Sequence, residues 1–191
     1  MSSQENALAA PAHRNHGLFS DHYLDNTLPA TEGWAALVEE ARPVRRKVRE
    51  ILAAYTPSEN EAQTEEGLIR PILRALGHDF RVQAPLQTPG GAKVPDYVLY
   101  RDRAALEASG DEVLTEQSLA GRAFAVGETK HWDRPLDVSL KRKGDAFTNR
   151  NPGYQISFYM RHAGTEWGVL TNGRLWRLYH RDSAHRLDVF Y

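Results

Sequence analysis

The dipeptide Asn172-Gly173 constrains the fold of this chain more than any other short feature. It lies between two β-prone runs, residues 167–171 and 175–181. Asn-Gly between two such runs is the strongest short-range signal for a β-hairpin, because both residues accept the backbone angles of a tight turn. We therefore predict two neighbouring antiparallel strands near the end of the sequence.

Three further strands are predicted upstream of this hairpin. Residues 80–86 and 95–101 are β-prone and are separated by a turn at residues 88–91, Thr-Pro-Gly-Gly. The apolar run at residues 123–130 predicts a third, buried strand. The polar stretch at residues 102–121 indicates an insertion that is partly helical.

Two helices are predicted before the strands. Apolar residues recur at helical spacing over residues 33–55, with a break or kink near Pro43. A second helix begins at Ser58, which forms a capping box with Glu61, and ends at Gly77.

Prolines mark two of the helices. Pro71 lies inside the second helix, and its ring presses on the carbonyl of Gly67, which predicts a tolerated kink. Asn151 and Pro152 are typical of an N-cap and a first helical position. They predict a third helix that runs to about His162.

The predicted order is helix, three strands, helix and two strands, which is the pattern of an α/β domain. We divide the chain into an N-terminal arm (1–32), a helical extension (33–57) and a main domain (58–191). The 191 residues contain no cysteine, which excludes disulfides, zinc–thiolate sites and cysteine nucleophiles. No signal peptide and no membrane-spanning run is present, so we expect a cytoplasmic protein.

The charge is unevenly distributed along the chain. Residues 1–130 hold 14 lysines and arginines against 19 acids, and residues 131–191 hold 10 against 6. The basic bias of the last third is compatible with phosphate contact, although a solvated surface explains it equally well. The cluster of Arg42, Arg45, Arg46, Lys47 and Arg49 is interpreted as a solvated helix face, with DNA contact as the alternative.

Three residues combine the groups that phosphodiester cleavage requires. Such cleavage needs oxygen ligands for Mg²⁺, a positioned water and a cation near the developing charge. Glu128 and Lys130 are two residues apart on a predicted strand, so both side chains leave the same face. Asp96 opens the preceding strand. If the two strands are neighbours, the three groups converge at one end of the sheet.

An acid two residues before a lysine is a weak signal by itself, because surface ion pairs have the same spacing. Lys130 is nevertheless the only one of the five lysines that has this spacing. Its strand also looks buried, and buried strands rarely carry Glu and Lys without a partner or a function.

Five segments together resemble the PD-(D/E)XK nuclease domain at the N-terminus of type IIG restriction–modification enzymes, which is similar to the nuclease domain of type I restriction enzyme R subunits. They are LIRPILRALG, VPDYVLY, AVGETKHWDRPLD, NPGYQISFY and WGVLTNGRLWRLY. The resemblance covers about residues 58–182, and residues 17–29 resemble the segment that precedes that domain. It implies a restriction-endonuclease-like α/β fold, in which helices flank a mixed sheet.

The resemblance also implies a role for each matching residue. Asp96 and Glu128 are expected to bind Mg²⁺, together with the backbone carbonyl of Thr129. Lys130 is expected to orient or activate the attacking water.

Two helices are expected to supply further site residues. Gln155, with Tyr159 one turn on, resembles the Q-x-x-x-Y motif that supports the site and the DNA. The acid of the first helix is Glu61, Glu65 or Glu66. Helical spacing favours Glu61 and Glu65; we prefer Glu65 as a metal ligand.

The expected function is Mg²⁺-dependent cleavage of DNA in bacterial restriction or phage defence. The alternatives are an inactive DNA-binding or scaffold module and a nuclease for RNA or DNA repair. Asn151-Pro152-Gly153-Tyr154 also resembles a methyltransferase motif, but a helix cap explains it.

The resembling enzymes carry a methyltransferase and a target-recognition region, which we expect beyond this chain or on a separate subunit. The apolar residues 189–191 suggest an element that continues. The alternative is a small nuclease that dimerises through an exposed apolar end.

Overall fold

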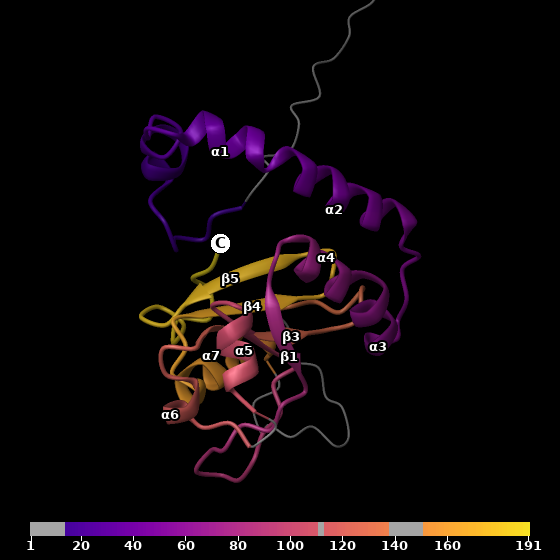
Figure 1. Cartoon of the computed structure of the whole chain (residues 1–191), viewed down its shortest axis with the longest axis vertical. Coiled ribbons are helices and arrows are strands. Elements are labelled where there is room, and N and C mark those ends of the chain that lie inside the picture. Colours follow the sequence, from indigo (N-terminus) through magenta and orange to yellow (C-terminus); the bar gives the residue numbers. More distant parts are fainter. Residues whose placement is uncertain (1–13, 111–112, 138–150) are drawn as a thin grey trace, which may run out of the picture.

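The computed structural model describes residues 14–110, 113–137 and 151–191, and a five-stranded mixed sheet forms its centre (Figure 1). The strands follow one another across the sheet in sequence order. All neighbours are antiparallel except β3 and β4, which are parallel. The strands are β1 (Asp79–Val82), β2 (Tyr97–Tyr100), β3 (Ala123–Thr129), β4 (Trp167–Thr171) and β5 (Trp176–His180).

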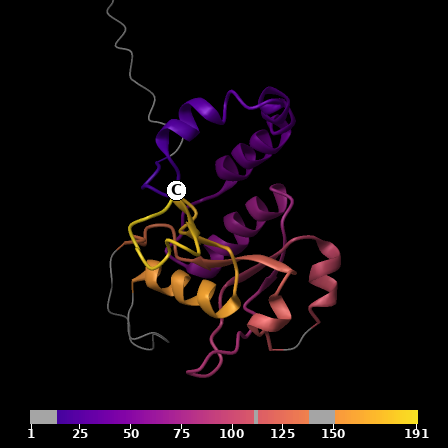
Figure 2. The same ribbon diagram turned by 90° about the vertical axis from the view of Figure 1, so that its left-hand side faces the viewer.

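Helices lie on both sides of this sheet, as Figure 2 shows, and the prediction of an α/β fold with a mixed, helix-flanked sheet is confirmed. The N-terminal part contains η1 (Tyr23–Thr27), α1 (Trp34–Glu40), α2 (Arg42–Ala54), α3 (Glu61–Thr64), η2 (Glu65–Ile69) and α4 (Arg70–Ala75). The others are α5 (Arg103–Ala108), α6 (Glu116–Leu119) and α7 (Pro152–Ala163). None of the helices described is long and apolar enough to cross a membrane.

The two faces of the sheet bury separate apolar clusters, because successive residues of a strand point to opposite faces. Val126 and Leu170 face α7 and pack with its Ile156. Leu99 and Ala125 face the other side. The cluster on that side also contains Tyr97 and, from the helix, Ile69 and Leu73.

Gly168 lets α7 lie close against β4. A Cβ at this position would come 2.8 Å from Cγ1 of Ile156, closer than real Cβ contacts. The close approach fixes the height of α7 above the sheet, and α7 carries two of the predicted site residues.

The first predicted strand is shorter than expected. It ends at Val82 instead of residue 86, because Gln83 adopts a left-handed φ of +48° that ordinary strands do not use. Backbone pairing resumes at Leu86, which exchanges hydrogen bonds with Lys93 (2.7 and 2.9 Å). The turn at residues 88–91 is confirmed.

The predicted hairpin of β4 and β5 is confirmed, with Thr171 opposite Trp176. Its loop begins at Asn172 and ends at Leu175, so it is longer than the two-residue turn of the sequence signal. Oδ1 of Asn172 accepts a hydrogen bond from the amide of Leu175 (2.7 Å), and Gly173 takes a φ of +81°. Asn172 therefore closes the loop with its side chain.

The helix that precedes the sheet begins later than predicted. Its N-cap is Asn60, whose side chain accepts the amide hydrogen of Gln63 (3.3 Å). The predicted capping box of Ser58 and Glu61 is therefore wrong. Ser58 instead accepts the amide hydrogen of Asn60 (3.0 Å) and fixes the entry to the helix.

The kink predicted at Pro71 takes the form of a π-helical turn, η2. The amide of Arg70 bonds to the carbonyl of Glu65, five residues earlier. Pro71 has no N–H and its ring crowds the carbonyl of Gly67, so a regular α-helix loses a hydrogen bond at this point. A π-turn adds a residue to the turn, and such turns are frequent at functional sites.

The predicted break near Pro43 and the predicted third helix are both confirmed. Ala41 separates α1 from α2, and Pro43 lies in the first turn of α2. Asn151 caps α7 by accepting the amide hydrogen of Gly153 (2.8 Å). The polar insertion is partly helical, as predicted, because it contains α5 and α6.

The arm packs against the last residues of the chain. The ring of His16 stacks on Phe190 at 4.2 Å, and Phe19 meets Tyr191 edge-on at 5.5 Å. Tyr191 exchanges two backbone hydrogen bonds with Leu178 of β5 (2.8 and 3.0 Å). Phe190 is buried, which contradicts the exposed apolar end of the alternative, a nuclease that dimerises through it.

Candidate active site

Asp96 and the end of β3 meet, as the sequence predicts for neighbouring strands. Oδ2 of Asp96 accepts hydrogen bonds from the backbone amide (2.7 Å) and the hydroxyl (2.8 Å) of Thr129. Thr129 is fully buried, and Asp96 is half-buried and directly precedes β2. These two bonds orient the Asp96 carboxylate.

Glu128 and Lys130 form a nearly buried ion pair. Nζ of Lys130 lies 2.5 Å from Oε1 of Glu128, and the two side chains are 13% and 8% exposed. The amide of Lys130 bonds to the carbonyl of Thr171 (2.8 Å), so strand pairing continues past the end of β3. This pairing keeps Lys130 on the same face as Glu128.

The second carboxylate oxygen of Glu128, Oε2, is buried and has no hydrogen-bond partner among the residues described. Burial raises the pKa of Glu128 to about 8; Lys130 opposes this shift and Asp96 adds to it. Burial lowers the pKa of Lys130, but the carboxylates of Glu128, Glu61 and Asp96 offset this effect, and the net shift is upward. A buried, unpartnered carboxylate oxygen is unusual in a folded protein and requires an explanation.

The first helix brings two acids to this place. Ligand oxygens of Glu61, Glu65 and Asp96 all lie within 4.8 Å of one another. Glu66, the third candidate, points outward and is 68% exposed, with an ion pair to Arg70 at 2.5 Å. The structure thus brings together Glu65, our preferred residue, and Glu61, and it separates Glu66 from them.

Glu65 is held in position by neighbours that the sequence did not indicate. The hydroxyl of Tyr97 donates a hydrogen bond to Oε2 of Glu65 (2.9 Å), and Arg70 lies 3.5 Å from the same oxygen. Burial and the charge of Asp96 raise the pKa of Glu65. Tyr97 directly follows Asp96, but nothing in the sequence pattern pairs it with a helix 32 residues earlier.

The donor set fits a divalent cation with oxygen ligands. Carboxylate oxygens are the ligands that Mg²⁺ and Ca²⁺ prefer. Crowded carboxylates repel one another unless a proton or a cation lies between them. The unpartnered oxygen of Glu128 is the second observation that points to a cation. The predicted role of the Thr129 carbonyl stays a prediction.

The helix α7 carries the two predicted residues Gln155 and Tyr159. Oε1 of Gln155 is buried and has no hydrogen-bond partner in the described parts of the chain. The hydroxyl of Tyr159 donates to the carbonyl of Val94 (2.9 Å), and the charges of Glu128 and Asp96 help burial to raise its pKa. Tyr159 therefore fastens α7 to the segment that leads into β2.

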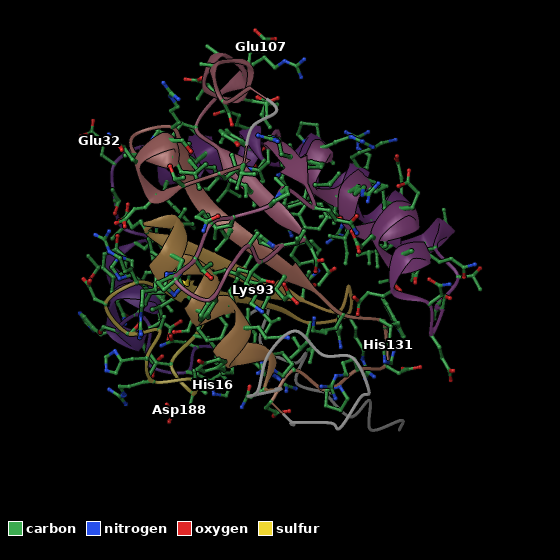
Figure 3. The ribbon with its side chains drawn as sticks, turned by 90° about the horizontal axis from the view of Figure 1, so that it is seen from below. His16, Glu32, Lys93, Glu107, His131 and Asp188 are labelled. Carbon is green, nitrogen blue, oxygen red and sulfur yellow. The ribbon has the colours of Figure 1, made fainter. Side chains whose placement is uncertain are left out.

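Two loops border the site, and Figure 3 labels one residue of each. Lys93 lies in the loop before Asp96, and His131 directly follows Lys130. Nδ1 of His131 is buried without a hydrogen-bond partner among the described residues.

Comparison with known proteins gives no match. No family model, no curated protein and no solved structure matches this chain.

Proposed function

We propose that this chain is a Mg²⁺-dependent endonuclease that hydrolyses phosphodiester bonds of DNA, with a restriction-endonuclease-like (PD-(D/E)XK) core. One observation carries the proposal: Glu128 shares one oxygen with Lys130 and keeps the other buried without a partner. Asp96 is fixed directly before the neighbouring strand β2, which gives two acids and a lysine at one sheet end.

The metal would be held by Asp96, Glu128 and Glu65, with the carbonyl of Thr129 as a further ligand. Glu61 joins this set because it shares the cluster with Asp96 and Glu65. A divalent cation supplies positive charge that polarises the phosphate and favours attack by water at neutral pH.

The remaining groups would act on the water or the phosphate and would not bind the metal. Lys130, oriented by its ion pair with Glu128, is suited to position the attacking water and to stabilise negative charge on the phosphate. Gln155 offers a buried amide group to a substrate or to the water. Tyr159 holds the helix that carries Gln155 and acts as a positioning residue.

The element order supports this proposal. A helix carrying acids precedes three antiparallel strands, and a second helix leads to a strand parallel to the third. This is the order predicted from the local helix and strand signals of the sequence, and a mixed sheet flanked by helices is what the resemblance implies.

A catalytically inactive DNA-binding or scaffold module is the alternative. Asp96 and Lys130 both bond within the chain, to Thr129 and Glu128, as residues of a structural network do. A purely structural network, however, gives no reason for the unpartnered oxygen of Glu128.

The proposal places the chain in a bacterial restriction–modification or phage-defence system in the cytoplasm. Its partners would be DNA and a methyltransferase or target-recognition region or subunit. Co-purification with the products of neighbouring genes tests this part independently of cleavage.

A plasmid-cleavage assay tests the activity. Wild type, Lys130→Ala and the surface control Lys47→Ala are incubated with supercoiled plasmid in Mg²⁺, Mn²⁺ or EDTA. We expect nicked or linear products with wild type and the control in either metal, and none with Lys130→Ala or EDTA. Cleavage by Lys130→Ala equal to that of wild type, or wild-type cleavage in EDTA, overturns the proposal.

A further inference from the structure

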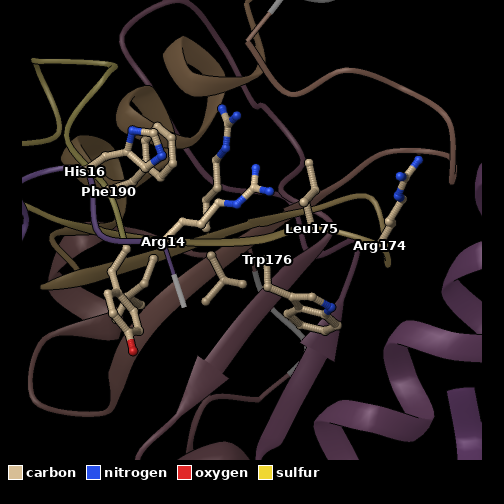
Figure 4. A pocket seen from close by; sticks show the side chains of 10 residues that line it. Arg14, His16, Arg174, Leu175, Trp176 and Phe190 are labelled. Atoms are coloured by element: carbon tan, nitrogen blue, oxygen red, sulfur yellow. The ribbon is translucent and has the colours of Figure 1, made fainter. Parts of the chain in front are cut away.

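A groove of about 710 Å³ lies outside the candidate active site, along the outer strand β5 (Figure 4). One wall is formed by the hairpin residues Arg174 to Leu178 and the other by Arg14 and His16 of the arm. Phe190 and Tyr191 close it between them. The arm and the end of the chain thus build a second concave surface together with β5.

The groove is basic although the chain as a whole is not. Arg14, Arg174, Arg177 and His16 line it, and no acidic side chain lines it within the described part of the chain. The whole chain has a formal net charge of −1, so these cations are a local concentration. A concave surface of one sign focuses its field on ligands of the other sign.

One guanidinium of the groove is held in place. Arg177 lies over the ring of Phe190 at 4.1 Å, its side chain is 13% exposed, and Asp137 approaches it at 3.7 Å. Arg14 and Arg174 are exposed at the two sides. The groove therefore offers one fixed and two accessible cations to an anionic ligand.

Trp176 connects the groove with the candidate active site. Its Nε1–H donates to the carbonyl of Gly173 (3.2 Å), which fixes the half-buried indole. The same residue lines a small internal cavity together with Glu128 and Thr129. Trp176 is opposite Thr171, which pairs with Thr129, so the groove lies two strands away from the end of β3.

We propose that this groove binds a single-stranded segment of nucleic acid next to the cleavage site. Arg14 and Arg174 contact its phosphates, and Trp176 offers a ring to a base. Cations that track a backbone beside an aromatic ring are the features by which proteins bind single strands. The volume is in the range of small-ligand pockets and is too small for a duplex. The choice of nucleic acid rests on the proposed function.

An acidic peptide is the competing occupant, since it meets the same arginines. We favour nucleic acid because the indole adds a surface for base stacking and because the groove adjoins a site that fits phosphodiester chemistry. The two occupants are separate arms of the test.

The test measures binding of a fluorescent oligothymidine of about 12 nucleotides by fluorescence anisotropy. The buffer contains EDTA, which prevents metal-dependent cleavage of the probe. Wild type is compared with Arg14→Gln, Arg174→Gln and the double variant. Arg101→Gln, an exposed arginine outside the groove, is the matched control. Each phosphate contact removed lowers the slope of log affinity against log salt by about 0.7. We expect the magnitude of this slope to fall by about 0.7 for each single variant and by about 1.4 for the double variant.

The proposal is overturned if the groove variants bind like Arg101→Gln, or if polyglutamate competes as well as unlabelled oligothymidine. Thermal unfolding of each variant verifies that it is folded. Because the assay contains no metal, its result is independent of the plasmid assay. Binding that depends on Arg14 and Arg174 supports the groove even where the chain does not cleave, and cleavage without such binding leaves only the nuclease proposal.

Discussion

The hydroxyl of Tyr55 lies 3.0 Å from the hydroxyl of Thr64, and this contact joins the helical extension to the candidate site. Tyr55 caps the end of α2, and Thr64 directly precedes Glu65. The ring of Tyr55 also covers Gly67, where a Cβ would come within 3.3 Å, and it packs on Trp132 at 5.5 Å. The extension thus supports the π-turn that carries Glu65.

Two substitutions of Tyr55 should distinguish the contribution of its ring to stability from that of its hydroxyl. We expect Tyr55→Phe to lower the free energy of unfolding by about 1 kcal/mol through loss of one hydrogen bond. Tyr55→Ala also removes half-buried ring packing and should cost about 2 kcal/mol or more. Urea unfolding measures both. Tyr23→Phe, at an exposed tyrosine of the arm, is the control, and equal stability of all three variants contradicts the role of Tyr55.

Two substitutions of Asp96 should have different effects on stability but the same effect on cleavage. Asp96→Ala leaves the buried amide and hydroxyl of Thr129 without an acceptor, which should cost about 1–3 kcal/mol. Asp96→Asn keeps an accepting oxygen and should stay within about 0.5 kcal/mol of wild type. Both should abolish plasmid cleavage. Full cleavage by Asp96→Asn would show that its charge has no role.

The stability of the metal-free chain should depend on pH through Glu128. Burial raises the pKa of its carboxyl from the ordinary 4.5 to about 8. Between these values the folded chain retains a proton that the unfolded chain releases. The free energy of unfolding therefore falls as pH rises from about 5 to about 8.

Urea unfolding in EDTA at the two ends of this range measures the effect. Glu128→Gln removes the titrating group and should flatten the dependence. Glu66→Gln, at a 68% exposed acid, should leave it unchanged. A wild-type chain as stable at about pH 8 as at about pH 5 contradicts the raised pKa.

Truncation of Gln155 should lower activity and not stability, whereas truncation of Tyr159 should lower stability. The buried Oε1 of Gln155 has no hydrogen-bond partner among the described residues, so Gln155→Leu should leave the melting temperature unchanged or raise it. The cleavage rate should fall at least about tenfold, as for a group that assists proton transfer or charge stabilisation. Tyr159→Phe loses the bond to Val94 and should cost about 1 kcal/mol. A large drop in melting temperature with full activity for Gln155→Leu makes it a structural residue.

Local signals predicted the parts of the fold that depend on neighbouring residues. Asn172-Gly173 predicted the hairpin, and Asn151 predicted the start of α7. The two-residue spacing of Glu128 and Lys130 predicted that their side chains lie on the same face of the strand. Each of these follows from backbone geometry over fewer than about ten residues. The convergence of Asp96 with β3 required only that consecutive strands be neighbours.

Features that depend on contacts between distant segments were missed. Competition between two capping residues placed the N-cap at Asn60 instead of Ser58. The bond from Tyr97 to Glu65 joins a strand to a helix, and no local pattern encodes it. Phe190 stacks on His16, which lies near the other end of the chain.

The π-turn at Glu65–Ile69 makes the spacing of the first helix as important as its composition. The turn holds one residue more than an α-helix uses. A regular α-helix over the same residues would rotate everything upstream, including Glu61, by about 100° relative to Leu68 and Ile69. A substitution that straightened this turn would therefore move Glu61 away from Glu65 and Asp96 while leaving every carboxylate in the sequence. An alignment that matches only the acids would overlook the loss.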